Sequence, residues 1–237
     1  MAPTTRLTVK QFLMKPFRFV PALLLTLFLP AAAQVAKEAN KEYQSPADRE
    51  RIIQRLENTD RVERLKLKEL IPLLGIRPGS TVADVATGTG IMLPFLVEAV
   101  GPSGRVVAED IQQQFLDKAQ EKVKANGWSN VTLTLGADRN PNLPAGQLDL
   151  VFILDAFHHF DYPGEMLDHI ARSLKPGGRL AIMEIYQKRR GSKDEDMSKH
   201  VRADKDQFIR EIEGLGWRLL SQTDHGANQY LLIFSKK

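Results

Sequence analysis

The sequence predicts an α/β fold, a three-layer sandwich whose seven-stranded sheet is mostly parallel and ends in an antiparallel C-terminal hairpin. Near-continuous apolar segments alternate along the chain with amphipathic segments of helical periodicity, a pattern typical of a parallel sheet covered on both faces. The last two apolar segments are separated only by residues 224–228. That connection is too short for a crossover helix, so these two strands should be antiparallel.

The individual elements follow from local periodicity. Strands are expected at residues 81–86, 105–110, 131–137, 148–155, 179–186, 218–223 and 229–235. Helices are expected at residues 47–58, 60–74, 91–100, 112–126, 163–174 and 204–214. Gly75 and Gly127 follow two of these helices as stop signals. The polar residues 187–203 are expected to form a surface loop.

The first 33 residues have the composition of a targeting segment. Residues 1–18 are basic and acid-free, residues 19–33 form a short apolar run, and small residues end it, which are the three parts of a secretory signal peptide. The run is shorter than the roughly 20 residues that a membrane-spanning helix needs. We therefore expect an exported, periplasmic protein, with an uncleaved membrane anchor or an amphipathic extension as the alternatives. We expect residues 34–46 to form a polar linker and residues 47–237 to form the folded domain.

The charge balance excludes one broad class of function. The chain has 33 Lys and Arg residues against 29 Asp and Glu residues, a formal net charge of +4. Four of the basic residues lie in the targeting segment, so 29 basic side chains face 29 acidic ones in the remainder. A globally cationic nucleic-acid binder is therefore not expected, although a local basic patch stays open. The absence of cysteine excludes disulfides, thiolate metal sites and cysteine nucleophiles.

A glycine-containing turn joins the first expected strand to its helix at residues 84–90. Glycines let the backbone approach a ligand closely, and the following helix N-terminus favours negative charge. A dinucleotide-binding turn would carry a third small residue. Counting from Gly88 that position is Leu93, and counting from Ala86 it is Ile91, so binding of a diphosphate in that manner is disfavoured.

This turn resembles motif I of the class I S-adenosylmethionine (SAM)-dependent methyltransferases, in which a strand ending in Asp continues into Gly-x-Gly-x-Gly. Asp84, Gly88 and Gly90 match the motif, and Ala86 stands where its first glycine normally lies. The resemblance covers about residues 65–235 and implies a Rossmann-like fold with SAM as cofactor. The alternative for Asp84 is a simple turn cap.

Further segments resemble the family in the same order. Asp110 ends the second strand and matches the acid that binds the ribose hydroxyls, with an ordinary helix cap as its alternative. Glu109 is an adjacent candidate, but the strand period would point it to the other face. Asp138 resembles the acid that meets the adenine amino group, or belongs to an Asx-turn. The resemblance implies cofactor binding by Asp84, Ala86, Gly88, Gly90, Asp110, Ile111, Ala137, Asp138 and Asp155.

The loop after the fourth strand carries candidates for chemistry. Methyl transfer is an in-line displacement at sulfonium, and it needs a base only when the acceptor must lose a proton. The loop resembles Asp-x-x-x-His segments of phosphoethanolamine methyltransferases, with Asp155 and His159 at the matching positions and His158 beside them. We expect these three residues to orient or deprotonate the acceptor, with packing and hydrogen bonding as the alternative. No metal site is expected from the two histidines, because no third ligand is close by in sequence.

The resemblance implies a SAM-dependent methyltransferase that acts on a small or membrane-associated, lipid-like acceptor. It is similar in type to the quinone-biosynthesis C-methyltransferases. The alternatives are a non-catalytic protein of the same fold and, less favoured, a nicotinamide-dependent oxidoreductase. The fourth strand is not followed by the Asn/Asp-Pro-Pro-aromatic run of enzymes that methylate base amines, so no nucleic-acid partner is expected. Contact with a membrane surface stays open, and the sequence does not indicate an oligomeric state.

Overall fold

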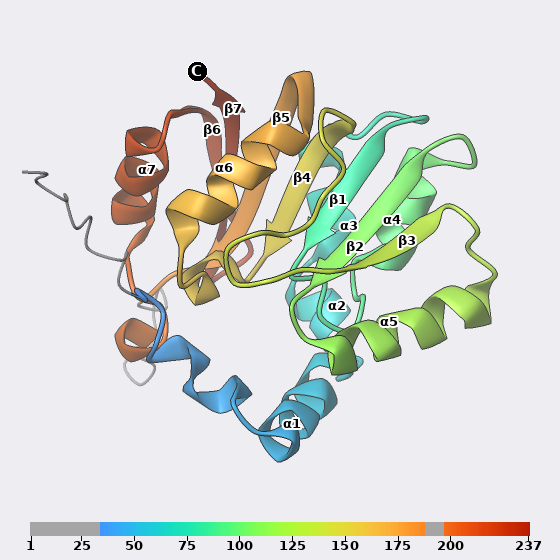
Figure 1. Ribbon diagram of the computed structural model, residues 1–237, viewed down its shortest axis with the longest axis horizontal. Coiled ribbons are helices and arrows are strands. Elements are labelled where there is room, and N and C mark those ends of the chain that lie inside the picture. The colour runs from blue at the N-terminus through green and yellow to red at the C-terminus, as the bar shows by residue number, and fades with distance from the viewer. Residues whose placement is uncertain (1–33, 188–196) are drawn as a thin grey trace, which may run out of the picture. The chain divides into compact units, whose positions relative to one another are not determined.

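The computed structural model describes residues 34–187 and 197–237 (Figure 1). The expected signal peptide at residues 1–33 and most of the expected surface loop therefore lie outside the described residues. Among the described helices, none combines the length and the apolar character that crossing a membrane requires.

The sheet has the predicted seven strands. They are β1 (Thr81–Val85), β2 (Arg105–Asp110), β3 (Val131–Leu135), β4 (Leu148–Leu154), β5 (Leu174–Ile185), β6 (Trp217–His225) and β7 (Gln229–Lys236). Their order is β3-β2-β1-β4-β5-β7-β6, with β7 antiparallel to both of its neighbours and the pairs from β3 to β5 parallel (Figure 1). The predicted fold class, including the antiparallel C-terminal hairpin, is confirmed.

Helices of two kinds connect and cover the strands. The α-helices are α1 (Pro46–Leu56), α2 (Arg61–Arg64), α3 (Leu67–Leu74), α4 (Leu93–Val100), α5 (Gln113–Asn126), α6 (Pro163–Ser173) and α7 (Lys205–Gly214). The short 3₁₀ helices are η1 (Ala39–Tyr43), η2 (Phe157–His159) and η3 (Met197–Lys199). Two successive residues of β1 show that helices cover both faces of the sheet, because neighbouring residues of a strand point to opposite faces. Val82 belongs to the part of the core that α3, α4 and α5 line, whereas Ala83 belongs to the part that α6 and α7 line.

The single helix expected over residues 60–74 is divided in two. Lys66 lies between α2 and α3 with a left-handed φ of 48°. Leu65 and Leu67 are both buried, yet residues two apart on one continuous helix do not share a face. The left-handed residue turns the chain so that both leucines reach the core.

The segment that its polar composition marks as a linker is packed on the domain. Ala36 and Ala39 are buried, three residues apart, and η1 begins at Ala39. The Asn40 side-chain amide donates hydrogen bonds to the His159 carbonyl at 2.9 Å and to the Asp161 carboxylate at 3.2 Å. Two small apolar residues and one amide therefore hold a mostly polar segment against the loop after β4.

The order of the strands determines where the ligand site lies. From β1 the chain proceeds to β2 and β3 on one side, and from β4 to β5 on the other. In open α/β sheets, the crevice at such a reversal lies outside the carboxyl ends of the strands and accommodates ligands. The ends of β1, β2 and β4 meet there, and these are the strands that carry the predicted acids.

Candidate functional site

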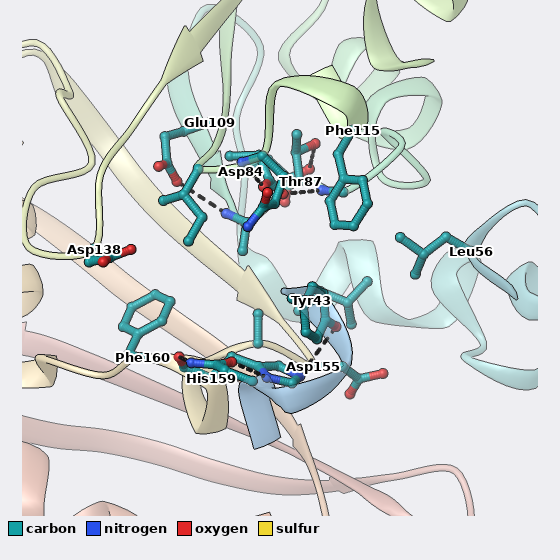
Figure 2. Close-up of a pocket in the computed structure, with 18 of the residues that line it drawn as sticks. Tyr43, Leu56, Asp84, Thr87, Glu109, Phe115, Asp138, Asp155, His159 and Phe160 are labelled. Atoms are coloured by element: carbon teal, nitrogen blue, oxygen red, sulfur yellow. Dashed lines mark hydrogen bonds between the residues drawn. The ribbon is translucent and has the colours of Figure 1, made fainter. Parts of the chain in front are cut away.

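A cavity of about 360 Å³ lies at the carboxyl ends of β1, β2 and β4 (Figure 2). This volume is within the usual range for small-molecule sites. The predicted residues that line it are Asp84, Ala86, Gly88, Asp110, Ile111, Ala137, Asp138, Asp155 and His159. Gly90 and His158 are not part of its wall; Gly90 shapes the turn behind it, and His158 lies deeper.

The turn after β1 requires left-handed backbone at alternate positions. Ala86, Gly88 and Gly90 have φ values of 57°, 57° and 81°. A side chain at Gly90 would place its Cβ 2.7 Å from a methyl carbon of Leu93, so a larger residue does not fit without a shift. Alanine at position 86 adopts the conformation that glycine adopts freely, at a cost of roughly 1–2 kcal/mol. Alanine in place of the first motif glycine therefore keeps the left-handed backbone conformation of the turn.

Two neighbouring acids at the end of β2 hold this turn. The Asp110 carboxylate accepts hydrogen bonds from the backbone amides of Gly88 at 2.9 Å and Gln112 at 2.8 Å. Glu109 accepts one from the Ala86 amide at 3.2 Å, and its other oxygen has no partner among the described residues. The expectation that Glu109 faces away from the site is wrong. Its longer side chain, one residue before the end of β2, reaches the turn beside Asp110.

Asp155 directly follows β4 and has a left-handed conformation, with φ at 47°. Its Oδ1 atom is buried and has no hydrogen-bond partner among the described residues. Burial, followed by the nearby Glu184 carboxylate, raises the pKa of Asp155 to about 6. A partnerless acceptor at the cavity wall favours a ligand that donates a hydrogen bond there.

Carboxylates dominate the electrostatics of the cavity. Asp84, Glu109 and Asp110 are buried in its wall, and Asp155 is partly buried. Burial raises the pKa of Asp84 to about 7 and that of Asp110 to about 6, and it raises the pKa of Glu109 well above its usual range. Arg61, at the start of α2, brings a partly buried guanidinium to the same wall. This arrangement suits a ligand with positive charge and several hydrogen-bond donors.

Sequence reasoning missed the residues that η1, α1 and α2 contribute. Tyr43, Leu56 and Arg61 line the cavity, and Phe115 joins them from α5 (Figure 2). Burial raises the pKa of Tyr43 to about 12, so its phenol stays protonated. The Tyr43 hydroxyl lies 3.5 Å from Nε2 of His159. The sequence carries one local signal for them: Tyr43 and Leu56 are an aromatic and an aliphatic residue within densely polar segments.

The paired histidines have different surroundings. The His159 ring lines the cavity, and its Nδ1 lies 2.9 Å from the Asn40 side-chain oxygen. Burial lowers the pKa of His159 to about 2, which keeps its imidazole neutral. His158 is buried, with Nδ1 at 2.9 and 2.8 Å from the two Glu184 oxygens. Burial opposes protonation of His158, but the Glu184 carboxylate outweighs it and raises the pKa.

Comparisons with known proteins agree with this geometry. Residues 82–178 match the family model of a methyltransferase domain. The ubiquinone/menaquinone biosynthesis C-methyltransferases UbiE of Hydrogenovibrio crunogenus and Pseudomonas paraeruginosa are each 34% identical over 125 residues, covering 52% of this chain and 49% of theirs. The chain thus spans about half the length of these curated relatives. A SAM-dependent methyltransferase from Aquifex aeolicus superposes with a TM-score of 0.72 and 27% identity, over 78% of this chain and 96% of that one.

The chain therefore carries a class I SAM-dependent methyltransferase domain, and SAM is the cofactor of that class. Within the class, it is distantly similar to the UbiE quinone-biosynthesis C-methyltransferases. The cavity fits the cofactor, because SAM carries a sulfonium and an ammonium charge and the wall of the cavity is rich in carboxylates. The buried, unpartnered oxygens of Glu109 and Asp155 also fit a ligand that brings hydrogen-bond donors, as SAM does.

We predict that Asp110→Ala raises the Kd for SAM about 10- to 100-fold, because the loss removes a charged acceptor worth roughly 1.5–3 kcal/mol. Calorimetric titration measures the change. Asp117→Ala, an exposed acid on α5, is the matched control and should leave the Kd unchanged. Unaltered affinity in Asp110→Ala would refute the assignment of Asp110 to the cofactor.

At position 86 we predict that Ala86→Gly changes the free energy of unfolding by less than about 1 kcal/mol, since relief of left-handed strain offsets the extra freedom of the unfolded chain. Ala86→Val should lower it by roughly 1–3 kcal/mol, because a β-branched residue is poorly tolerated at positive φ. Chemical denaturation measures the free energy of unfolding of both variants. Equal stability of the glycine and valine variants would contradict the strained turn.

The buried acids predict an inverse dependence of stability on pH. Their pKa values are raised on folding, so between about pH 4 and pH 7 these carboxyl groups bind more protons in the folded protein than in the unfolded chain. The free energy of unfolding of the ligand-free protein should therefore fall as pH rises through this range. The increase in Tm caused by SAM should grow over the same range, because ionised carboxylates bind the cation better. Scanning calorimetry at several pH values measures both, and an Asp155→Asn variant should show a shallower slope.

Proposed function

We propose that this protein transfers the methyl group of SAM to a small-molecule acceptor with an apolar, quinone-like or lipid-like body. The observation that carries the proposal is the composition of the cavity, where the carboxylate cluster is continuous with an apolar wall. Leu56, Ile111, Phe115 and Phe160 contribute that wall. The similarity to proteins named as quinone-biosynthesis C-methyltransferases supports the same acceptor class.

When bound, SAM supplies an electrophilic methyl group that an acceptor nucleophile displaces in line. The residues of this chain then have three tasks. Asp110 and Glu109 bind and orient the cofactor, and the apolar wall excludes water from the reacting atoms. Arg61 is placed to pair with the carboxylate of the methionine moiety, because it is the cavity-lining cation that the structure describes.

His159 and Tyr43 form the acceptor end of the cavity. Asn40 holds the His159 ring through Nδ1, so its Nε2 is presented beside the Tyr43 hydroxyl. A neutral imidazole and a protonated phenol suit hydrogen bonding to an acceptor oxygen better than removal of a proton. For an acceptor that must lose a proton, Asp155 is the better base, because a carboxylate with a pKa of about 6 is ionised and yet basic at neutral pH.

We further propose that the protein acts outside the cytosol, on the basis of its basic and apolar N-terminal composition. A membrane-associated acceptor would be accessible there. The proposal requires a supply of SAM in the same compartment. Cell fractionation with N-terminal sequencing tests it, and recovery of the intact chain in the cytosolic fraction would contradict export.

The experiment for the catalytic proposal uses SAM labelled in its methyl group and a panel of acceptors. We expect label in an organic-extractable product from a prenylated hydroquinone, and none from phosphoethanolamine. His159→Ala should lower kcat about 10-fold or more, which corresponds to one lost hydrogen bond, while the Kd for SAM changes less than about 2-fold. His169→Ala, a variant at a histidine on α6 away from the cavity, should retain full activity. Binding of SAM without transfer to any acceptor would instead favour a non-catalytic protein.

A further inference from the structure

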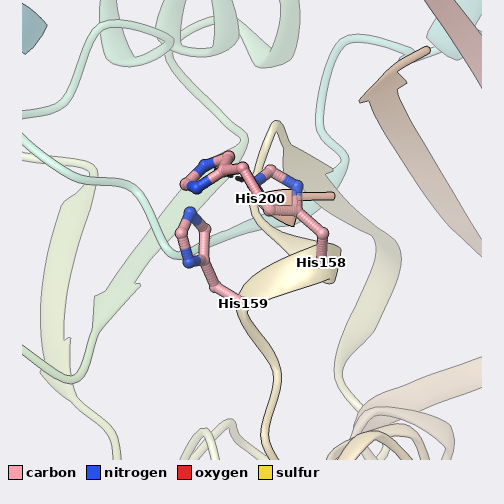
Figure 3. Close-up of side chains that lie close together, drawn as sticks. All are labelled: His158, His159 and His200. Carbon is pink, nitrogen blue, oxygen red and sulfur yellow. Dashed lines mark hydrogen bonds between the residues drawn. The ribbon is translucent and has the colours of Figure 1, made fainter. Parts of the chain in front are cut away.

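Three histidines converge beside the acceptor end of the cavity (Figure 3). His158 and His159 come from η2, and His200 follows η3, more than forty residues later in the chain. One ring nitrogen from each lies within 4.8 Å of the other two. The sequence does not indicate this third ligand, because only folding brings His200 to the pair.

The outer nitrogens of the pair are already held by oxygen acceptors. The Nδ1 atom of His158 lies against the Glu184 carboxylate, and that of His159 lies 2.9 Å from the Asn40 side-chain oxygen. The Asn40 amide nitrogen is committed to other acceptors, so its oxygen must face the ring. Because these oxygens only accept, both rings donate from Nδ1, which leaves Nε2 with a lone pair when the ring is neutral.

A carboxylate or amide that binds the outer nitrogen is the usual support of a metal-binding histidine. Nε2 of His158 lies 3.2 Å from Nε2 of His200. Two lone pairs at this distance repel unless a proton or a cation lies between them. Zinc–nitrogen bonds of 2.0–2.1 Å in a tetrahedron separate two ligands by about 3.3 Å, which matches the observed distance.

We propose that His158, His159 and His200 bind a divalent transition-metal ion of the zinc class. Imidazole donors favour such an ion over magnesium or calcium, and three ligands leave a fourth position open, as in catalytic zinc sites. The ring of His159 must move toward the other two to complete the set, which requires a side-chain rotation. Since His159 also lines the cavity, the ion would lie next to the acceptor end and could polarise an acceptor oxygen.

The ion would also join segments that are distant in sequence. Asn40 belongs to η1, His158 and His159 to η2, and His200 follows η3, so the site links three short helices around one end of the cavity. This inference is independent of the acceptor, because metal binding can be measured without SAM and without turnover.

The experiment titrates untagged, chelator-treated, full-length protein with Zn²⁺ in a calorimeter, and with Co²⁺ while its visible ligand-field bands are recorded. We expect saturation at one equivalent and the absorption of a tetrahedral Co²⁺ complex. His200→Ala should weaken Zn²⁺ binding more than about 100-fold, and Asn40→Ala or Glu184→Gln about 10- to 100-fold through loss of outer support. The matched control His169→Ala should bind Zn²⁺ as the unmodified protein does.

Two results would overturn the site. One is the absence of saturable Zn²⁺ binding, which would assign the close contact between His158 and His200 to a shared proton. The other is Zn²⁺ binding that His200→Ala and His200→Gln leave unchanged, which would place the ion elsewhere. SAM binding by each variant verifies that it is folded, so loss of metal affinity cannot be mistaken for unfolding.

Discussion

The site depends on the reversal of strand order between β1 and β4. Parallel strands run outward from this point in two directions, so no crossover connection covers the carboxyl ends of β1, β2 and β4. An acid lies at or next to the end of each of these strands, and the backbone of the β1 turn lies among these acids. The strand order therefore creates the cavity, and the side chains that line it determine which ligand binds.

That adaptation has an electrostatic cost. Burial of Asp84, Glu109 and Asp110 side by side disfavours their charged forms, as the raised pKa values show. Backbone amides of the turn offset part of the cost by donating to Asp110 and Glu109. A cationic ligand offsets more of it, which couples the occupancy of the cavity to the ionisation of its wall. The same acids thus shape the turn and select the charge of the ligand.

The sequence predicts those parts of the molecule that local pattern encodes. Strand and helix alternation identifies the sheet, and the short connection before Gln229 identifies the hairpin. Asp84 and Asp110 could be found because they end strands next to a glycine turn. Lys66 could not be recognised as a break, because its left-handed conformation serves two leucines that must both reach the core. Arg61 begins an expected helix but belongs to no motif, and His200 lies in a polar segment without periodicity, so only tertiary packing brings them to the cavity or its border.

Hydrogen–deuterium exchange tests whether SAM binds among the ends of β1, β2 and β4. Saturating SAM should slow amide exchange in peptides that cover residues 84–92 and 109–116, where the Gly88 and Gln112 amides lie. Peptides from the distant β6 edge, residues 217–225, should exchange at the same rate with and without SAM. Protection at β6 without protection of the two turns would place the SAM site elsewhere in the domain.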